Sequence, residues 1–198
     1  MKKIILGSMV LLAMASCSTP PQKKVVVMAS GKFTVSQTGD AIKFEPGTQH
    51  NEQVITLKGD KITLDDGSGS KELLVAEPGV YLLNLKNDTL IGSLQVFGDA
   101  STRESRITQD VLMERMDSLQ QLMLGQNLSP EKKNHFLAPR DFKKITSEDD
   151  AIVVGPFRGI PASLTPDKNG RVPEVYKFIT NKDARATLDR LNNMLKEQ

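Results

Sequence analysis

The chain has 198 residues, with 26 lysines and arginines, 24 aspartates and glutamates and a single cysteine. Lys2 and Lys3 supply the whole positive excess, so residues 17–198 are neutral overall, which argues against nucleic-acid binding. There is no tryptophan and there are only two tyrosines, so a sugar-stacking face is not expected. After the N-terminal region no apolar run approaches the roughly 18 residues that a membrane-spanning helix needs.

The first seventeen residues combine a positive start, an apolar stretch and a small-residue end. Lys2 and Lys3 precede the apolar run 4–15, which is too short to span a bilayer. Met14-Ala15-Ser16-Cys17 resembles the lipobox of bacterial lipoprotein precursors, with Met where Leu is commonest. The resemblance implies that residues 1–16 are a signal peptide and that Cys17 carries a diacylglycerol thioether and an acylated amine. An ordinary secretory signal with an incidental cysteine is the alternative.

Residues 17–23 are expected to form the lipidated tether, because Pro20 and Pro21 favour an extended, hydrated segment. The residue after Cys17 is Ser18 and not Asp, which under the sorting rule of enteric lipoproteins implies the outer membrane. No acidic run follows, so the protein is expected to face the periplasm. A mature chain without a free thiol suits that oxidising compartment.

Residues 24–100 are expected to form a β-rich domain of an α+β fold. Short apolar or alternating runs, such as Val54-Ile55-Thr56-Leu57, are separated by turn signals such as Gly59-Asp60 and Pro78-Gly79. This spacing predicts an antiparallel meander, either a sandwich or an open barrel. The expected strands are Lys24–Met28, Lys32–Gln37, Gln53–Lys58, Lys61–Leu64, Glu72–Ala76, Val80–Lys86 and Thr89–Phe97.

Residues 101–198 predict a helix and then a smaller mixed α/β region that ends in a second long helix. Within 103–124, apolar residues recur at helical spacing, and Ser129-Pro130-Glu131 favours a short helix. The largely apolar runs at residues 151–154 and 175–179 indicate buried strands. Thr180-Asn181-Lys182-Asp183 resembles a capping box, followed by leucines spaced for a helix.

Residues 155–174 are expected to form a long loop, since they contain four prolines and three glycines. A loop of this length in a compact domain is often functional. Arg158, Lys168 and Arg171 lie in it and are the candidate partner-binding residues, with the charge to receive an anionic group.

We find no motif that indicates catalysis, a cofactor or a metal site. His50 and His135 are expected to lie in exposed loops, with no second cysteine to join them as ligand. No Gly-x-Ser-x-Gly elbow is present. Residues 65–70 lack the ligand spacing of a calcium loop and favour a hairpin turn. The methionines of the first helix could bind Cu(I), but core packing is the better interpretation.

These observations favour a lipid-anchored, periplasm-facing protein that acts without catalysis as a binding or assembly module of the bacterial envelope. An envelope protein partner would contact the 155–174 loop or the methionine-bearing helix. A carrier of a small apolar ligand, with a cavity in the β-rich domain, is the alternative hypothesis. An envelope hydrolase with scattered catalytic residues is the third.

Overall fold

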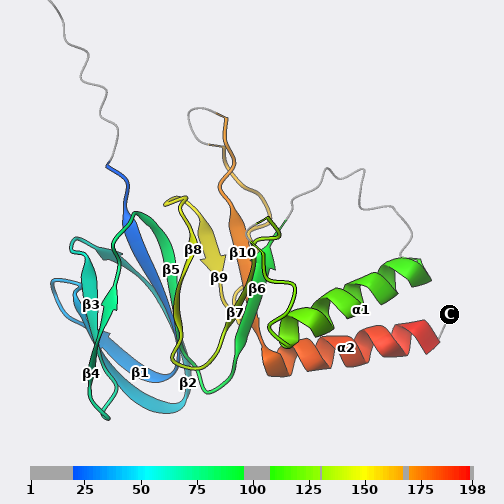
Figure 1. Ribbon diagram of the computed structural model, residues 1–198, viewed down its shortest axis with the longest axis horizontal. Coiled ribbons are helices and arrows are strands. Elements are labelled where there is room, and N and C mark those ends of the chain that lie inside the picture. Colours follow the sequence, from blue (N-terminus) through cyan, green and yellow to red (C-terminus); the bar gives the residue numbers. More distant parts are fainter. Residues whose placement is uncertain (1–19, 96–107, 130, 167–169, 197–198) are drawn as a thin grey trace, which may run out of the picture.

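The computed structural model describes residues 20–95, 108–129, 131–166 and 170–196. The signal segment, Cys17 and Lys168 lie outside the described residues, so lipidation stays a prediction. The described chain is a mixed α/β fold made mostly of strands, with one of its two helices near the C-terminus (Figure 1). The elements are β1 Lys23–Val35, β2 Ala41–Leu57, β3 Lys61–Asp65, β4 Ser70–Leu74, β5 Gly79–Leu85, β6 Leu90–Leu94, α1 Gln109–Met123, β7 Asn134–Leu137, β8 Phe142–Thr146, β9 Ile152–Val154, β10 Val175–Thr180 and α2 Asn181–Lys196.

The strands form two sheets. The first has the order β4-β3-β2-β1-β5-β8 and curls into a nearly closed, barrel-like shape, and the second has the order β7-β6-β10-β9 (Figure 1). Each sheet takes strands from both sides of residue 100, since β8 pairs with β5 and β6 pairs with β10. The proposed domain division at that residue stays a prediction.

Strands β1 and β5 lie side by side in parallel and are buried on both faces. One face of β1 contributes Val25, Val27 and Ala29 to the interior of the curled sheet. The other face contributes Val26 and Met28 to a second core against the smaller sheet. A strand covered on both sides needs a continuous apolar run, which residues 25–29 and 80–83 provide.

The expectation of a purely antiparallel meander is wrong for two strand pairs. β1 pairs with β5, and β2 pairs with β3, in parallel registers. The reason is that β5 returns to the free side of β1 after β3 and β4 have extended the opposite edge.

The short helix expected after Ser129 is also wrong, because residues 131–133 form a turn that leads into β7. Lys133 has a φ of 49°, which ends any helical path there.

The two long helices are confirmed and lie side by side (Figure 1), although residues 103–107 of the first expected helix lie outside the described residues. Thr108 caps α1 by accepting a hydrogen bond from the backbone N–H of Val111. The capping box before α2 is also confirmed, since the Thr180 hydroxyl donates to Asp183 Oδ2 over 2.7 Å and accepts from the backbone N–H of Asp183. Leu122 of α1 and Ala184 of α2 are buried where the helices pack against the smaller sheet.

Candidate functional site

A polar site lies where the two sheets, the start of the 155–174 loop and the start of α2 meet. We call it the Lys86 site and define its centre as His50, Glu52, Lys86 and Phe157. His50 and Glu52 lie in β2, Lys86 follows β5, and Phe157 follows β9. The residues are far apart in sequence, and the fold of the two sheets brings them together.

Lys86 is the most unusual member, because a lysine that is only 5% exposed is rare in proteins. Its Nζ donates to His50 Nδ1 over 2.7 Å. Within the described chain no carboxylate oxygen lies within 4.0 Å of this ammonium group. Burial lowers the pKa of Lys86 below its ordinary value, and the more distant charges of Glu52, Asp183 and Asp88 oppose that shift.

The partners of His50 fix its tautomer. A lysine ammonium can only donate, so His50 Nδ1 accepts and the ring proton of the neutral imidazole resides on Nε2. Nε2 faces Glu52 Oε2 at 3.7 Å. Burial, followed by the charge of Lys86, lowers the pKa of His50, while Glu52 acts in the opposite direction. The imidazole is therefore neutral at pH 7.

Glu52 connects the histidine to the 155–158 turn. Its side chain is 3% exposed, and Oε1 accepts from the backbone N–H of Gly155 over 3.2 Å. The same oxygen lies 3.7 Å from Arg158 Nε. Oε2 is buried and has no hydrogen-bond partner among the described residues. Gly155 allows this approach, because a Cβ atom there would lie 2.3 Å from Oε2.

Lys177 of β10 holds the same turn from the other side. Its Nζ donates to the carbonyl oxygens of Gly155 and Arg158, each over 2.6 Å. Phe157 lies between the two residues whose backbone is held in this way, Gly155 and Arg158, and its side chain is 69% exposed. Its ring centroid lies 4.3 Å from that of His50 and 5.2 Å from Lys86 Nζ. The turn thus presents an aromatic side chain to solvent on a fixed backbone.

A pocket of about 360 Å³ opens beside these residues. The buried Lys86 and the ring of Phe157 line one part of it, and the start of α2 lines another. The lining residues are Ser30, Thr48, His50, Lys86, Asn87, Asp88, Phe157, Thr180, Lys182 and Asp183. The pocket therefore presents charges of both signs beside an aromatic wall.

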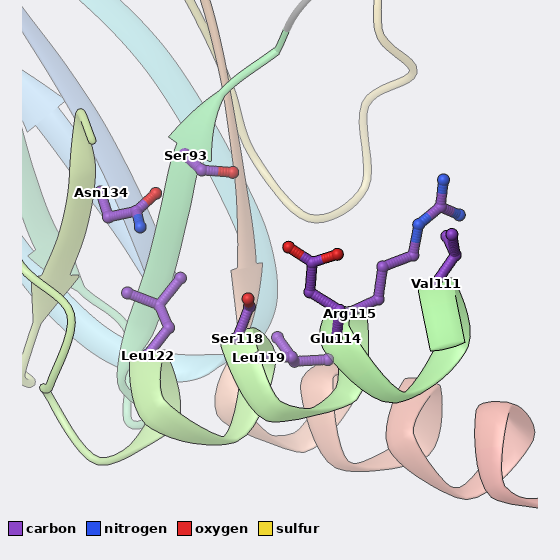
Figure 2. A pocket seen from close by; sticks show the side chains of 8 residues that line it. All are labelled: Ser93, Val111, Glu114, Arg115, Ser118, Leu119, Leu122 and Asn134. Carbon is purple, nitrogen blue, oxygen red and sulfur yellow. The ribbon is translucent and has the colours of Figure 1, made fainter. Parts of the chain in front are cut away.

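A second concavity, of about 450 Å³, lies between α1 and the smaller sheet. Figure 2 shows Leu122 nearest the sheet residues Asn134 and Ser93, with Glu114 and Arg115 farther along the helix. The expectation that the methionines of the first helix pack in the core holds only in part. Met123 packs against the core of the helices, whereas Met113 is mostly exposed.

The histidines do not lie in exposed loops, and that expectation is wrong. His50 lies in β2 and His135 in β7, and both are half-buried because each strand packs one face against its neighbours. His135 lines a third pocket beside Tyr176, and its Nε2 has no hydrogen-bond partner among the described residues. Burial, aided by the charge of Lys143, lowers the pKa of His135 to about 4.

The structure separates the candidate loop residues. Arg158 joins the Lys86 site through Glu52, whose backbone oxygen also accepts from Arg158 Nη2 over 3.4 Å. Arg171 pairs instead with Glu148 and Asp150.

Sequence reasoning missed His50, Glu52 and Lys86 as a group. The available signal was a lysine directly after the largely apolar strand 79–85, where a free surface charge is not expected.

Comparisons with protein families, with curated proteins and with solved structures found no match to this chain. No helix in the described ranges is long and apolar enough to cross a membrane. Those ranges also hold no group of three or more histidine, cysteine or acidic side chains arranged to bind a metal ion.

Proposed function

We propose that this protein is a lipid-anchored, periplasm-facing lipoprotein of the bacterial envelope, held in the outer membrane through Cys17. In this proposal it acts without catalysis as a binding or assembly module. The observation that carries the binding role is the turn at residues 155–158. It exposes Phe157 while Glu52 and Lys177 hold the backbone on either side.

An aromatic side chain held in this way is suited to a protein interface. Aromatic residues are enriched among the few residues that dominate binding energy. A turn that is already ordered loses little conformational entropy when a partner binds. Ile160 of the same loop is also exposed. This arrangement supports the 155–174 loop over the methionine-bearing helix as the contact.

The position of the tether favours the same role. β1 begins at Lys23, directly after the tether, and its register places Lys23 beside Gly79 and Ala29 beside Leu85. Lys86 therefore follows the end of the β1–β5 pair that is remote from the tether, about 20 Å along the strands. A lipid on Cys17 would leave the Lys86 site on the side away from the membrane, where a partner can reach it.

We interpret the curled sheet as an open barrel and not as a sandwich. Its interior is filled by side chains from all of its strands, among them Phe44, Ile62 and Leu83. A carrier needs apolar space that side chains do not fill. The packing of this interior therefore supports a binding module over a carrier of apolar ligands.

Crosslinking of the full-length lipoprotein in cells, with mass spectrometry of copurifying proteins, tests this proposal. We expect one dominant envelope protein, which is lost in the mislocalised Cys17→Ser variant. Deletion of residues 159–171 should also reduce its recovery. Unchanged recovery after the deletion, in a variant with unchanged stability, would count against the loop. A lack of any specific protein would favour the carrier.

A further inference from the structure

Lys86 lines the pocket of the Lys86 site, and its ammonium group uses only part of its hydrogen-bonding capacity among the described residues. It has three N–H donors, and His50 Nδ1 accepts one of them. No carboxylate of the described residues lies within 4.0 Å of this ammonium group, and a buried charge without a close counter-ion is unfavourable. An anionic group in the pocket would supply both the missing charge and further acceptors.

The pocket also carries two carboxylates, that of Asp88 between β5 and β6 and that of Asp183 in the first turn of α2. Asp88 Oδ2 accepts from the backbone N–H of Lys182 over 3.0 Å, and Asp88 Oδ1 accepts from the backbone N–H of Thr89 over 2.8 Å. Asp183 Oδ2 accepts from the hydroxyl of Thr180. These bonds fix two carboxylates in a lining that also holds Lys86 and Lys182, so the pocket offers partners for an ammonium group as well as for an anion.

We propose that this pocket binds a small zwitterion of the amino-acid class, a free amino acid or a short peptide with free termini. Lys86 binds the carboxylate of the ligand, Asp88 and Asp183 bind its ammonium group, and the ring of Phe157 covers its apolar part. The pocket volume of about 360 Å³ suits a ligand of this size.

The proposal is independent of the protein partner, because it concerns binding to the purified chain. Calorimetric titration of the detergent-solubilised full-length protein tests it, with alanine and the dipeptide Ala-Ala as probes. Acetate, ethylammonium and inorganic phosphate carry single parts of the recognised charge. We expect alanine or Ala-Ala to bind, and each single-charge probe to bind at least about tenfold more weakly.

Variants make the test specific. Lys86→Met, which keeps the length and apolar stem of the side chain, should weaken binding about tenfold or more. Lys32→Met, at an exposed position of β1, should leave binding unchanged. Bound Ala-Ala should also protect Lys86, but not Lys32, from acetylation in the unmutated protein, which is a readout that needs no variant.

Three results would overturn the proposal. The first is that neither alanine nor Ala-Ala binds. The second is that phosphate or acetate binds as tightly as the zwitterions, which would indicate a plain anion site. The third is equal binding by Lys86→Met and the unmutated protein, with no protection of Lys86, which would place the ligand elsewhere.

Discussion

The backbone N–H of Gly155 donates to Glu52 Oε1 over 3.2 Å, and a Cβ atom at residue 155 would lie 2.3 Å from Oε2 of the same carboxylate. The pair joins the larger sheet to the turn that exposes Phe157. The turn is therefore shaped by a buried charge on another strand, and any side chain at residue 155 would have to displace that charge.

Gly155→Ala should destabilise the turn. The added methyl group would collide with Glu52, so we expect a loss of about 1–3 kcal/mol in the free energy of unfolding. Faster amide hydrogen exchange at residues 155–158 should accompany it. Gly159→Ala is the matched control, because a Cβ atom there has open space around it. Equal stability of the two variants would contradict the close packing of Gly155 against Glu52.

Glu52→Gln should lower the pKa of His50 further. The negative charge of Glu52 raises the pKa of His50, in opposition to burial and Lys86, so its removal leaves only lowering influences. An NMR titration of the His50 ring in both proteins measures the shift. His135 serves as the internal control, because its pKa is shifted by burial and Lys143 and not by Glu52. A rise in the pKa of His50 would show that Glu52 does not act on it as described.

Lys86→Met should stabilise the ligand-free protein by about 1–3 kcal/mol, since it removes a buried charge that no carboxylate of the described residues contacts within 4.0 Å. The pKa of Lys86 in the folded state lies below the unfolded value of 10.5. The folded state therefore loses the proton first, and stability rises with pH between these two values. Urea unfolding from pH 7 to 10.5 should show a flatter dependence in the variant. A loss of stability in Lys86→Met would mean that the ammonium group is favourably solvated.

His135 should make the fold less stable in mild acid. Its pKa is about 4 in the folded state against 6.5 in the unfolded state, so its stabilising contribution is present above pH 6.5 and is lost as the pH falls toward 4. We expect this one residue to account for roughly 1–3 kcal/mol between pH 7 and pH 4. His135→Gln removes the titration, and urea unfolding should show a smaller acid loss for that variant. Identical acid losses would contradict the burial of the imidazole.

The local parts of the fold could be predicted from the sequence. The turn between β3 and β4 follows from Asp66-Gly67, and α2 follows from its capping box. The middle of β2 could not be predicted, because residues 45–52 are polar and show no alternation. Pairing with β1 holds that segment extended, with a register shift at Ser30 and Gly31. The parallel pairing of β1 with β5 likewise depends on the whole sheet and not on either strand alone.

The candidate site was harder to predict than the fold. Arg158 could be selected as a charged residue in a long loop, but its partner Glu52 lies on a strand more than a hundred residues earlier. His50 and Lys86 are 36 residues apart and show no spacing that indicates a shared site. Charges that become close only when two sheets pack together leave no local pattern in the sequence.

In the proposed function, the exposed Phe157 turn contacts an envelope protein in the lipid-anchored state. A photocrosslinking amino acid at residue 157 of the full-length lipoprotein, activated in living cells, tests it directly. Leu74 is the matched control site, since it is apolar, lies on β4 and is 68% exposed, against 69% for Phe157. We expect one discrete crosslinked protein from residue 157, absent from residue 74 and lost with Cys17→Ser. No crosslink from residue 157, or the same products from both sites, would contradict it.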